Sequence, residues 1–275
     1  MDSVEPGLVA ALVVVPTYNE RDTISEVVAR LFRGATHEVE LLVVDDASPD
    51  GTAQTVRALA ERYPIHLLER PRKLGLGTAY VAAFRWALER GYPAIVEMDG
   101  DLSHDPADVG RLLDALEEAD LAIGSRYVEE GRIPRWGLLR RALSRGGNAY
   151  ARRMLATGVR DSTSGLRAYR AGILGAVDLP TVRSEGYAFQ IEMTRRVRMA
   201  GGAIVEVPIT FDERAGDRSK MSRAIVLEAL ARVTLWGVRD RIGGLVRRGH
   251  LSRSDGDAAP QQAEGSPGTP SSDRP

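Results

Sequence analysis

Short runs of apolar, mostly β-branched residues alternate with segments of helical periodicity over residues 8–209. The runs that predict strands are Leu8–Val15, Val39–Val44, Ile65–Leu68, Ala94–Met98, Leu121–Gly124 and Ala203–Ile209. In the first intervening segment, Ile24, Val27, Val28 and Leu31 repeat at the spacing of one helix face, and residues 52–62 and 78–90 repeat likewise. Strands that alternate with helices form a mostly parallel sheet with helices on both faces. The sequence therefore predicts an α/β fold.

Three later segments differ from this pattern. Residues 131–160 contain eight arginines and no acidic residue, which fits a solvated helix face or a surface for anionic lipid. Residues 224–246 predict one or two amphipathic helices that either lie on a membrane surface or dock onto the core. Residues 250–275 lack aromatic residues and are rich in Ser, Pro and Gly, so we expect disorder there. The expected parts are a main domain over 1–210, a loop with amphipathic helices over 211–249, and a tail over 250–275.

Composition and charge exclude several classes of protein. The net charge of -1 predicts no general attraction to nucleic acid, and the absence of cysteine excludes disulfides and thiolate-bound metals. The N-terminus lacks the basic start and apolar core of a signal peptide, and no apolar run approaches the roughly 18 to 20 residues that span a bilayer. We therefore expect a cytoplasmic protein without a transmembrane helix of its own.

Polar residues directly follow four of the predicted strands. These segments are Pro16–Glu20, Asp45–Thr52, Asp99–Asp101 and Gly124–Tyr127. Ligands of an open α/β sheet bind beyond the carboxyl ends of its strands, so the segments should meet at one edge. Three acidic clusters there would repel one another unless a cation or a ligand rich in hydrogen-bond donors lies among them. A nucleotide diphosphate with Mg²⁺ or Mn²⁺ suits such a place, because a hard cation binds carboxylate and phosphate oxygens together.

The acidic motifs leave alternatives open. An extended chain would place Asp99 and Asp101 on one face, whereas a turn would let one carboxylate meet the metal and the other the sugar or ribose. A purely structural turn or helix cap is a further reading of the same residues. Asp45 and Asp46 could likewise cap the helix that begins near Thr52, or bind a base or ribose.

A basic, glycine-rich turn precedes the helix expected at 78–90. It contains Arg70, Lys73, Gly75 and Gly77, and a helix N-terminus of this kind favours phosphate. The turn lacks the third glycine of a dinucleotide-binding fingerprint and does not follow the first strand. This argues against a Rossmann-type oxidoreductase.

Taken together, the motifs resemble family 2 glycosyltransferases, and within them the dolichol-phosphate or polyprenol-phosphate mannose synthases. The matching motifs are Pro16–Glu20, Asp45–Thr52, Lys73–Gly77, Met98–Pro106, Gly124–Arg126, Asp161–Arg167, Gly186–Glu192, and Glu206–Ile209 with Arg214, Ser219 and Lys220. The resemblance covers about Leu8 to Met221. Each motif alone is weak, but eight in order are highly specific.

The resemblance implies a GT-A fold that binds GDP-mannose and Mg²⁺ or Mn²⁺ and transfers mannose, with inversion, to a polyprenyl monophosphate. By matching position, the residues implied for the nucleotide sugar are Pro16, Tyr18, Glu20, Val44, Asp46, Asp99, Gly100, Asp101, Arg214 and Lys220. Those implied for the metal are Asp99, Asp101 and Ser103. Family members often carry Gln where this chain has Ser103, so Ser103, His104 or water would take the place of that ligand.

For the phosphate of the lipid acceptor, the resemblance implies Arg126, Arg140, Arg145 and Ser164. A phosphate monoester is already anionic near neutral pH and needs no strong general base. Positioning and charge neutralisation should therefore dominate catalysis. The residues implied to be catalytic are Asp101, Arg126, Arg214 and Lys220.

Some relatives of these enzymes carry transmembrane helices after the catalytic domain, and others rely on a membrane partner. For this chain the resemblance implies peripheral attachment to the cytoplasmic face of a membrane, or a membrane-anchoring partner protein. Two rival functions remain open. One is a transferase of the same fold that uses UDP-glucose or another nucleotide sugar, and the other is a non-catalytic subunit that kept the fold.

Overall fold

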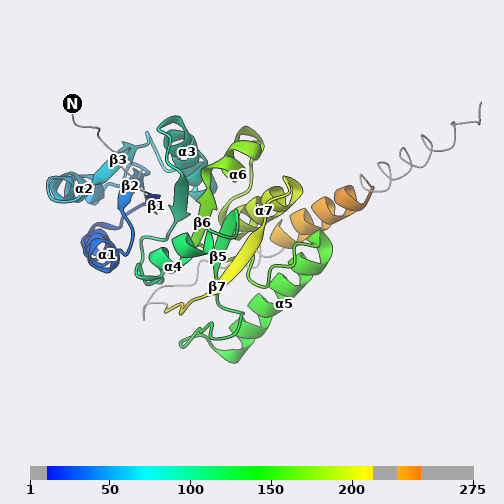
Figure 1. Cartoon of the computed structure of the whole chain (residues 1–275). Coiled ribbons are helices and arrows are strands. Elements are labelled where there is room, and N and C mark those ends of the chain that lie inside the picture. Colours follow the sequence, from blue (N-terminus) through cyan, green and yellow to red (C-terminus); the bar gives the residue numbers. More distant parts are fainter. Residues whose placement is uncertain (1–10, 213–227, 243–275) are drawn as a thin grey trace, which may run out of the picture.

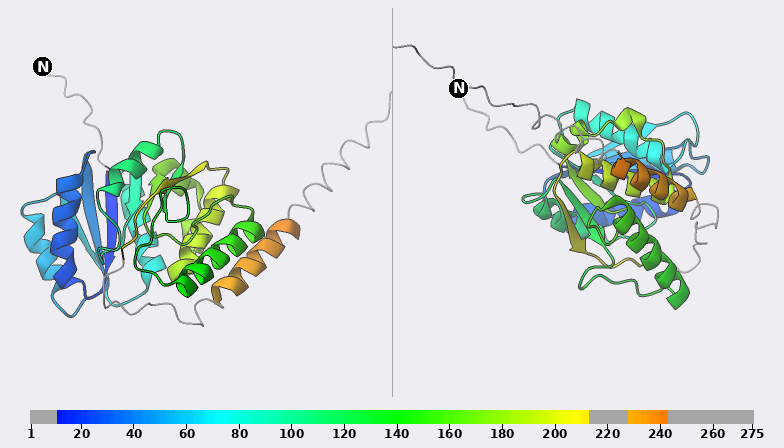
Figure 2. Two further views of the ribbon diagram at one scale, coloured as in Figure 1. Left: turned by 90° about the horizontal axis from the view of Figure 1, so that it is seen from below. Right: turned by 90° about the vertical axis from the view of Figure 1, so that its right-hand side faces the viewer.

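The computed structural model describes residues 11–212 and 228–242, in which seven strands form one sheet between two layers of helices (Figures 1 and 2). The strands are β1 (Ala11–Thr17), β2 (Val39–Asp45), β3 (Ile65–Glu69), β4 (Ala94–Glu97), β5 (Leu121–Ser125), β6 (Arg167–Arg170) and β7 (Ile204–Pro208). The helices are α1 (Arg21–Gly34), α2 (Thr52–Ala60), α3 (Leu76–Glu89), α4 (Asp108–Ala115), α5 (Leu138–Leu155), α6 (Ala171–Ala176) and α7 (Gly186–Met199), with a 3₁₀ turn at Leu179–Thr181. The predicted α/β fold is confirmed.

The strand order is β3-β2-β1-β4-β6-β5-β7. All pairings are parallel except those of β6, which runs antiparallel to both β4 and β5. The six predicted strands are present with small shifts at their ends, although Leu8 lies outside the described residues. The sequence prediction missed β6, because its four residues begin and end with arginine.

Alternate residues of β1 enter two separate cores, and this is why the sheet is buried on both faces. Leu12 and Val14 pack into the core under α3, α6 and α7, whereas Val13 and Val15 pack into the core under α1, α2 and α4. A strand buried on both faces reads as a continuous apolar run, as this one does. The parallel strands then end together at one edge of the sheet.

Helix α5 and a helix over residues 228–242 lie side by side at one end of the molecule (Figure 1). Val233 packs among Ala151, Leu155 and Ile191, and the Tyr150 and Thr234 hydroxyls are 2.6 Å apart. The sequence left open whether this amphipathic segment docks onto the core or lies on a membrane. The structure shows docking for one face of the helix. Its other face leaves Leu235 exposed, so this docking leaves apolar surface uncovered.

No helix within the described residues is long and apolar enough to cross a bilayer. The predicted tail over 250–275 and most of the predicted segment over 211–249 lie outside the described residues.

Candidate active site

A polar cleft of about 670 Å³ opens where the parallel strands end. It is built from the loops after β1, β2, β4 and β5, the start of α3, the start of α7 and the loop before β6. Of the residues that the resemblance implied, those that line it are Pro16, Tyr18, Glu20, Asp46, Asp99, Gly100, Asp101, Ser103, Arg126 and Arg140. Residues from the four polar segments after the strands thus come together at one edge of the sheet.

Asp99, Gly100 and Asp101 leave β4 in a turn on the floor of the cleft. Asp101 Oδ1 accepts a hydrogen bond of 2.9 Å from the Ser103 backbone N–H, and Leu102 adopts a positive φ of 64°. Burial and, second, the charge of Asp99 raise the pKa of Asp101, although the Ser103 hydrogen bonds oppose this. The sequence left open whether Asp99 and Asp101 lie in an extended chain or in a turn, and the structure shows a turn.

Two neighbours confine the Asp99 carboxylate. His104 Nε2 lies 3.3 Å from Asp99 Oδ2, and the His104 side chain is almost completely buried. On the other side, a methyl group at Gly165 would lie only 2.7 Å from the same oxygen. A glycine is therefore required at 165 for the loop before β6 to approach this carboxylate so closely.

The two carboxylates fit a divalent cation that also binds the ligand. Within residues 11–212 and 228–242, no group of three or more acidic, histidine or cysteine side chains is arranged to hold a metal unaided. Asp99 and Asp101 supply two oxygen ligands of the type that Mg²⁺ and Mn²⁺ prefer. Burial and, second, the charge of Asp99 raise the pKa of Asp101, and a cation would offset both effects. The remaining ligands would be water and the oxygens of a bound diphosphate, as is usual for Mg²⁺. Ser103 also faces the cleft.

Asp45 and Asp46 take different roles at the end of β2. Asp45 accepts hydrogen bonds from Thr17 Oγ1 and from the backbone and hydroxyl of Ser48, so it organises the loop. Asp46 lines the cleft, where it pairs with Arg70 and accepts a bond of 3.0 Å from the Leu74 N–H. Neither carboxylate caps α2, because Asp50 Oδ1 accepts the bond from the Thr52 N–H.

The end of the cleft near β1 and β3 combines an aromatic ring with a cation. Lys73 Nζ lies 3.9 Å from the centre of the Tyr18 ring, and both side chains line the cleft. The N-terminus of α3, for which the sequence suggested phosphate, carries a carboxylate of the protein itself: the Gly77 N–H donates a bond of 2.9 Å to Glu185 Oε2. One backbone N–H of that helix end is therefore already bonded to a protein carboxylate, whose charge also suits the helix dipole.

Arg126 occupies the opposite end, after β5, and is held by a buried ion pair. Its Nε and Nη2 bond to the two carboxylate oxygens of Asp161, each at 2.7 Å, and Nη2 also bonds to Thr163 Oγ1. Burial alone would raise the pKa of Asp161, but the charge of Arg126 and the hydrogen bonds from Arg126 and Thr163 together outweigh burial and lower that pKa. Trp136 stands between two cations, with Arg126 and Arg140 at 5.4 and 3.9 Å from its ring centre.

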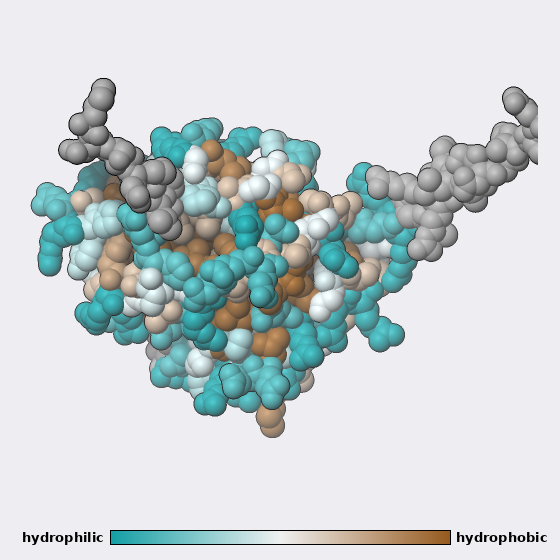
Figure 3. Space-filling view, viewed as in Figure 1, coloured by the Kyte–Doolittle hydropathy of each residue, from teal (hydrophilic) through white to brown (hydrophobic). Residues whose placement is uncertain are grey.

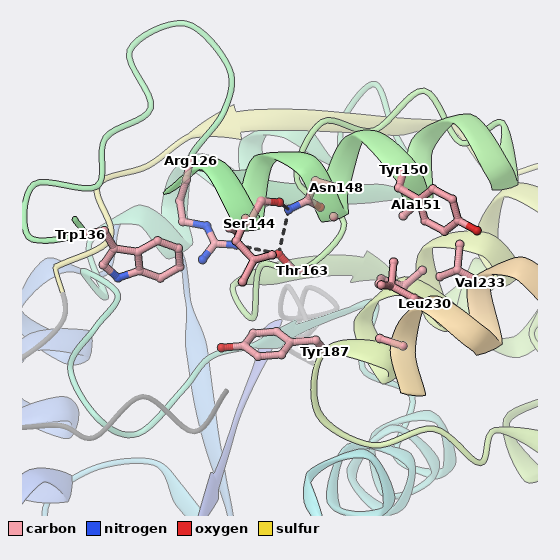
Figure 4. Close-up of a pocket in the computed structure, with 14 residues that line it drawn as sticks. Arg126, Trp136, Ser144, Asn148, Tyr150, Ala151, Thr163, Tyr187, Leu230 and Val233 are labelled. Carbon is pink, nitrogen blue, oxygen red and sulfur yellow. Dashed lines mark hydrogen bonds between the residues drawn. The ribbon is translucent and has the colours of Figure 1, made fainter. Parts of the chain in front are cut away.

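A second, largely apolar cavity continues from this end, between α5, α7 and the helix over 228–242 (Figure 4). It shares Arg126, Trp136, Thr163 and Tyr187 with the polar cleft. Figure 4 shows Arg126, Trp136 and Tyr187 at one end of it and apolar side chains at the other. The apolar part is lined by Leu143, Ala151, Ile191, Leu230 and Val233. The polar cleft and the apolar cavity therefore meet at the guanidinium of Arg126.

Some of the residues that the sequence implied lie elsewhere. Val44 is fully buried in β2, Ser164 is buried beside Arg167, and Arg145 is on the surface near Tyr127, so none of their side chains lines either cavity. Arg214 and Lys220 lie outside the described residues.

Several cleft residues received no role from the sequence. They are Trp136, Thr163, Gly165, Tyr187, Gln190 and Phe211. Trp136 and Phe211 belong to a chain that is only 5% aromatic, and each lies in a polar segment. An isolated aromatic residue in a polar segment was therefore the sequence signal that could have indicated Trp136 and Phe211 as site residues.

A doubly covered, mostly parallel sheet with paired carboxylates at its carboxyl edge is the arrangement expected of a nucleotide-sugar transferase. The sequence profile described as glycosyl transferase family 2 matches residues 12–177, and the chain belongs to that family. The undecaprenyl-phosphate mannosyltransferase of Micrococcus luteus is 50% identical over 86% of this chain and 98% of its own length. The polyprenol monophosphomannose synthase of Mycolicibacterium smegmatis is 48% identical over 86% and 91%. The dolichol-phosphate mannosyltransferase of Pyrococcus furiosus is 33% identical over 84% and 65%.

Solved structures show the same GT-A fold. Glucosyl-3-phosphoglycerate synthase from Mycobacterium tuberculosis, in complex with Mn²⁺, UDP and glucosyl-3-phosphoglycerate, matches with a TM-score of 0.58. It is 22% identical, and the match covers 85% of this chain and 80% of that one. The expected GT-A architecture is confirmed.

Proposed function

We propose that the protein transfers mannose from GDP-mannose to a polyprenyl monophosphate, with inversion at the anomeric carbon, and needs Mg²⁺ or Mn²⁺. One observation carries this proposal: a polar cleft with two carboxylates on its floor continues, past Arg126, into an apolar cavity. A nucleotide sugar fits the first, and the start of an isoprenoid chain fits the second. The names of the relatives that are 48% and 50% identical, a polyprenol monophosphomannose synthase and an undecaprenyl-phosphate mannosyltransferase, support the same assignment.

In this proposal, each end of the cleft has a separate task. Asp99 and Asp101 would hold the cation, which would neutralise charge on the diphosphate leaving group. Tyr18 offers an aromatic face for the base, and Lys73 adds a positive charge beside it. The matched positions Arg214 and Lys220 would add charge near the donor phosphates. These residues bind and orient the donor so that its anomeric carbon faces Arg126.

Arg126 and Arg140 would hold the acceptor phosphate at the junction of cleft and cavity. The ion pair with Asp161 uses Nε and Nη2 and fixes the plane of the Arg126 guanidinium, so Nη1 is the nitrogen that would donate to the phosphate. Because the phosphate oxygen is already an anion, its lone pair attacks the anomeric carbon directly while the bond to the diphosphate breaks. No protein base has to remove a proton in this step.

The direct test is an assay of the purified protein with polyprenyl phosphate and radiolabelled GDP-mannose, UDP-glucose or UDP-N-acetylglucosamine. We expect lipid-linked sugar from GDP-mannose alone, with Mg²⁺ or Mn²⁺ present, and no product after chelation with EDTA. Product only from a UDP-sugar would favour the rival donor. No product from any donor would favour a non-catalytic subunit, and activity in EDTA would contradict the cation.

We also place the cavity-bearing end of the molecule against the cytoplasmic face of a membrane, because the acceptor is a lipid. Leu138 and Leu139 at the start of α5 are 84% and 85% exposed, and Leu235 on the neighbouring helix is 69% exposed. Arginines accompany them on α5, at 140, 141, 145, 152 and 153. In the view of Figure 3, hydrophobic surface gathers toward the middle of the molecule, with hydrophilic residues around it. Apolar side chains beside arginines suit an anionic lipid surface.

A flotation assay with vesicles checks this placement. The protein should float with vesicles that contain phosphatidylglycerol, float less with purely zwitterionic vesicles, and lose most binding when Leu138 and Leu139 are both changed to Gln. Met199→Gln, which alters an exposed apolar side chain at the end of α7, is the matched control and should bind as wild type. Failure to float with any vesicle would instead indicate attachment through a partner protein.

A further inference from the structure

The His104 ring lies between the carboxylate floor of the cleft and its acceptor end. It follows the Asp99–Asp101 turn by three residues and is only 3% exposed. Its Nε2 is 3.3 Å from Asp99 Oδ2, yet neither ring nitrogen has a well-formed hydrogen bond to any described residue. A buried ring nitrogen without a hydrogen bond costs free energy. A small movement of Asp99 Oδ2 toward Nε2, which would complete a hydrogen bond, is therefore favoured.

The other side of the same ring contacts the acceptor end through two aromatic residues. His104 packs edge-on against Phe211, with ring centres 5.2 Å apart, and Phe211 packs edge-on against Trp136 at 5.8 Å. Arg126 lies within 5.5 Å of both ring centres. A backbone hydrogen bond also connects the segment of His104 with that of Phe211: the Asp212 N–H donates a bond of 3.0 Å to the carbonyl of Ser103.

We propose that His104 is a positioning residue with two separable functions: its Nε2 orients Asp99 for the cation, and its ring supports Phe211 and Trp136 beside the acceptor phosphate. The inference rests on the proposed use of Asp99 for a divalent cation and of Arg126 for a phosphate. Hydrogen bonds to a ligating carboxylate fix its orientation, and aromatic edge contacts fix the neighbouring rings. The Asp99 oxygen that contacts His104 is also the one nearest to Gly165, so His104 and Gly165 confine the same carboxylate oxygen.

Two substitutions separate the two functions. His104→Phe keeps a ring against Phe211 and removes Nε2, whereas His104→Gln keeps a side-chain N–H donor and removes the ring. Isothermal titration calorimetry gives two affinities for each variant: that for Mn²⁺ with saturating GDP, and that for farnesyl phosphate with Mn²⁺ and GDP present. His37→Phe, at the opposite edge of the sheet and beside Asp114, is the matched control.

We expect His104→Phe to weaken Mn²⁺ binding about tenfold and to change farnesyl phosphate binding less than about threefold. For His104→Gln we expect the reverse: near-wild-type Mn²⁺ binding and farnesyl phosphate binding weakened about three- to tenfold. His37→Phe should change neither affinity. Two variants that lower the thermal midpoint but leave both affinities unchanged, or that weaken both equally, would overturn the proposal.

These readouts also separate this inference from the proposed function. Titration of Mn²⁺ with GDP involves no sugar transfer, so the effect of His104→Phe stands even if no mannosyl lipid is formed. If the wild type binds Mn²⁺ with GDP but does not bind farnesyl phosphate, the lipid acceptor is wrong and the second function of His104 falls with it. If the wild type does not bind Mn²⁺, the first function is overturned.

Discussion

Changing Asp101 to Asn is expected to lower kcat about 10³-fold or more and to leave the free protein at least as stable as wild type. A catalytic cation contributes several kcal/mol to transition-state stabilisation, and each 1.36 kcal/mol is about a factor of ten in rate. Asparagine keeps the oxygen that accepts the bond from the Ser103 N–H but removes the charge that binds the cation. Burial and the charge of Asp99 raise the pKa of Asp101, so at neutral pH the folded state bears an unfavourable charge that the variant lacks.

The measurement pairs single-turnover kinetics with urea unfolding, each with and without Mn²⁺ and GDP. Wild type should gain stability when Mn²⁺ and GDP are added, and the variant should not. Asp22→Asn is the matched control, because the Asp22 side chain is 89% exposed in the first turn of α1. A variant within tenfold of wild-type kcat would rule Asp101 out as a ligand of an essential cation.

The fold could be predicted largely because its signals are local. Each parallel strand is buried on both faces and therefore reads as an uninterrupted apolar run, and the helices between them show a periodic apolar face. The edge where the ligand binds follows from that alternation alone. The strand β6 carries no such signal. Arg167 is completely buried there because its guanidinium bonds to the carbonyls of Ser162, Ser164 and Gln190 and to Thr194 Oγ1.

The site could be predicted only in part, because its decisive contacts join residues that are distant in sequence. The motifs brought Asp99, Asp101 and Arg126 to the cleft, yet nothing local indicates that Arg126 pairs with Asp161, 35 residues away. The same holds for Asp46, which pairs with Arg70, and for the α3 N-terminus, which binds Glu185 across 108 residues. In the sequence Asp46 and the α3 N-terminus have no visible protein partner, but in the structure Asp46 pairs with Arg70 and the Gly77 N–H of α3 bonds to Glu185.

The pair of Arg126 and Asp161 supports the second large prediction: Asp161→Asn should reduce the free energy of unfolding by about 3–5 kcal/mol, since it leaves a buried guanidinium without its counter-charge. Both Asp161 oxygens are used, by Arg126 and by the Thr163 hydroxyl, and its side chain is inaccessible to solvent. Urea unfolding measures the loss. Asp240→Asn breaks a more exposed pair, between Arg195 on α7 and Asp240 on the helix over 228–242, and should cost about 1 kcal/mol or less.

A double variant then separates stability from catalysis. Arg126→Met with Asp161→Leu removes both charges at once, and replacement of a buried ion pair by apolar side chains of similar volume is commonly neutral or stabilising. We therefore expect it to regain most of the stability lost in Asp161→Asn. Its kcat/KM for polyprenyl phosphate should nevertheless stay at least about 100-fold below wild type, because the Arg126 guanidinium is missing where the cleft and the cavity meet and Arg140 alone is left for the phosphate. A stable and active double variant would show that Arg126 serves the fold alone, and the acceptor phosphate would then have to be held by Arg140.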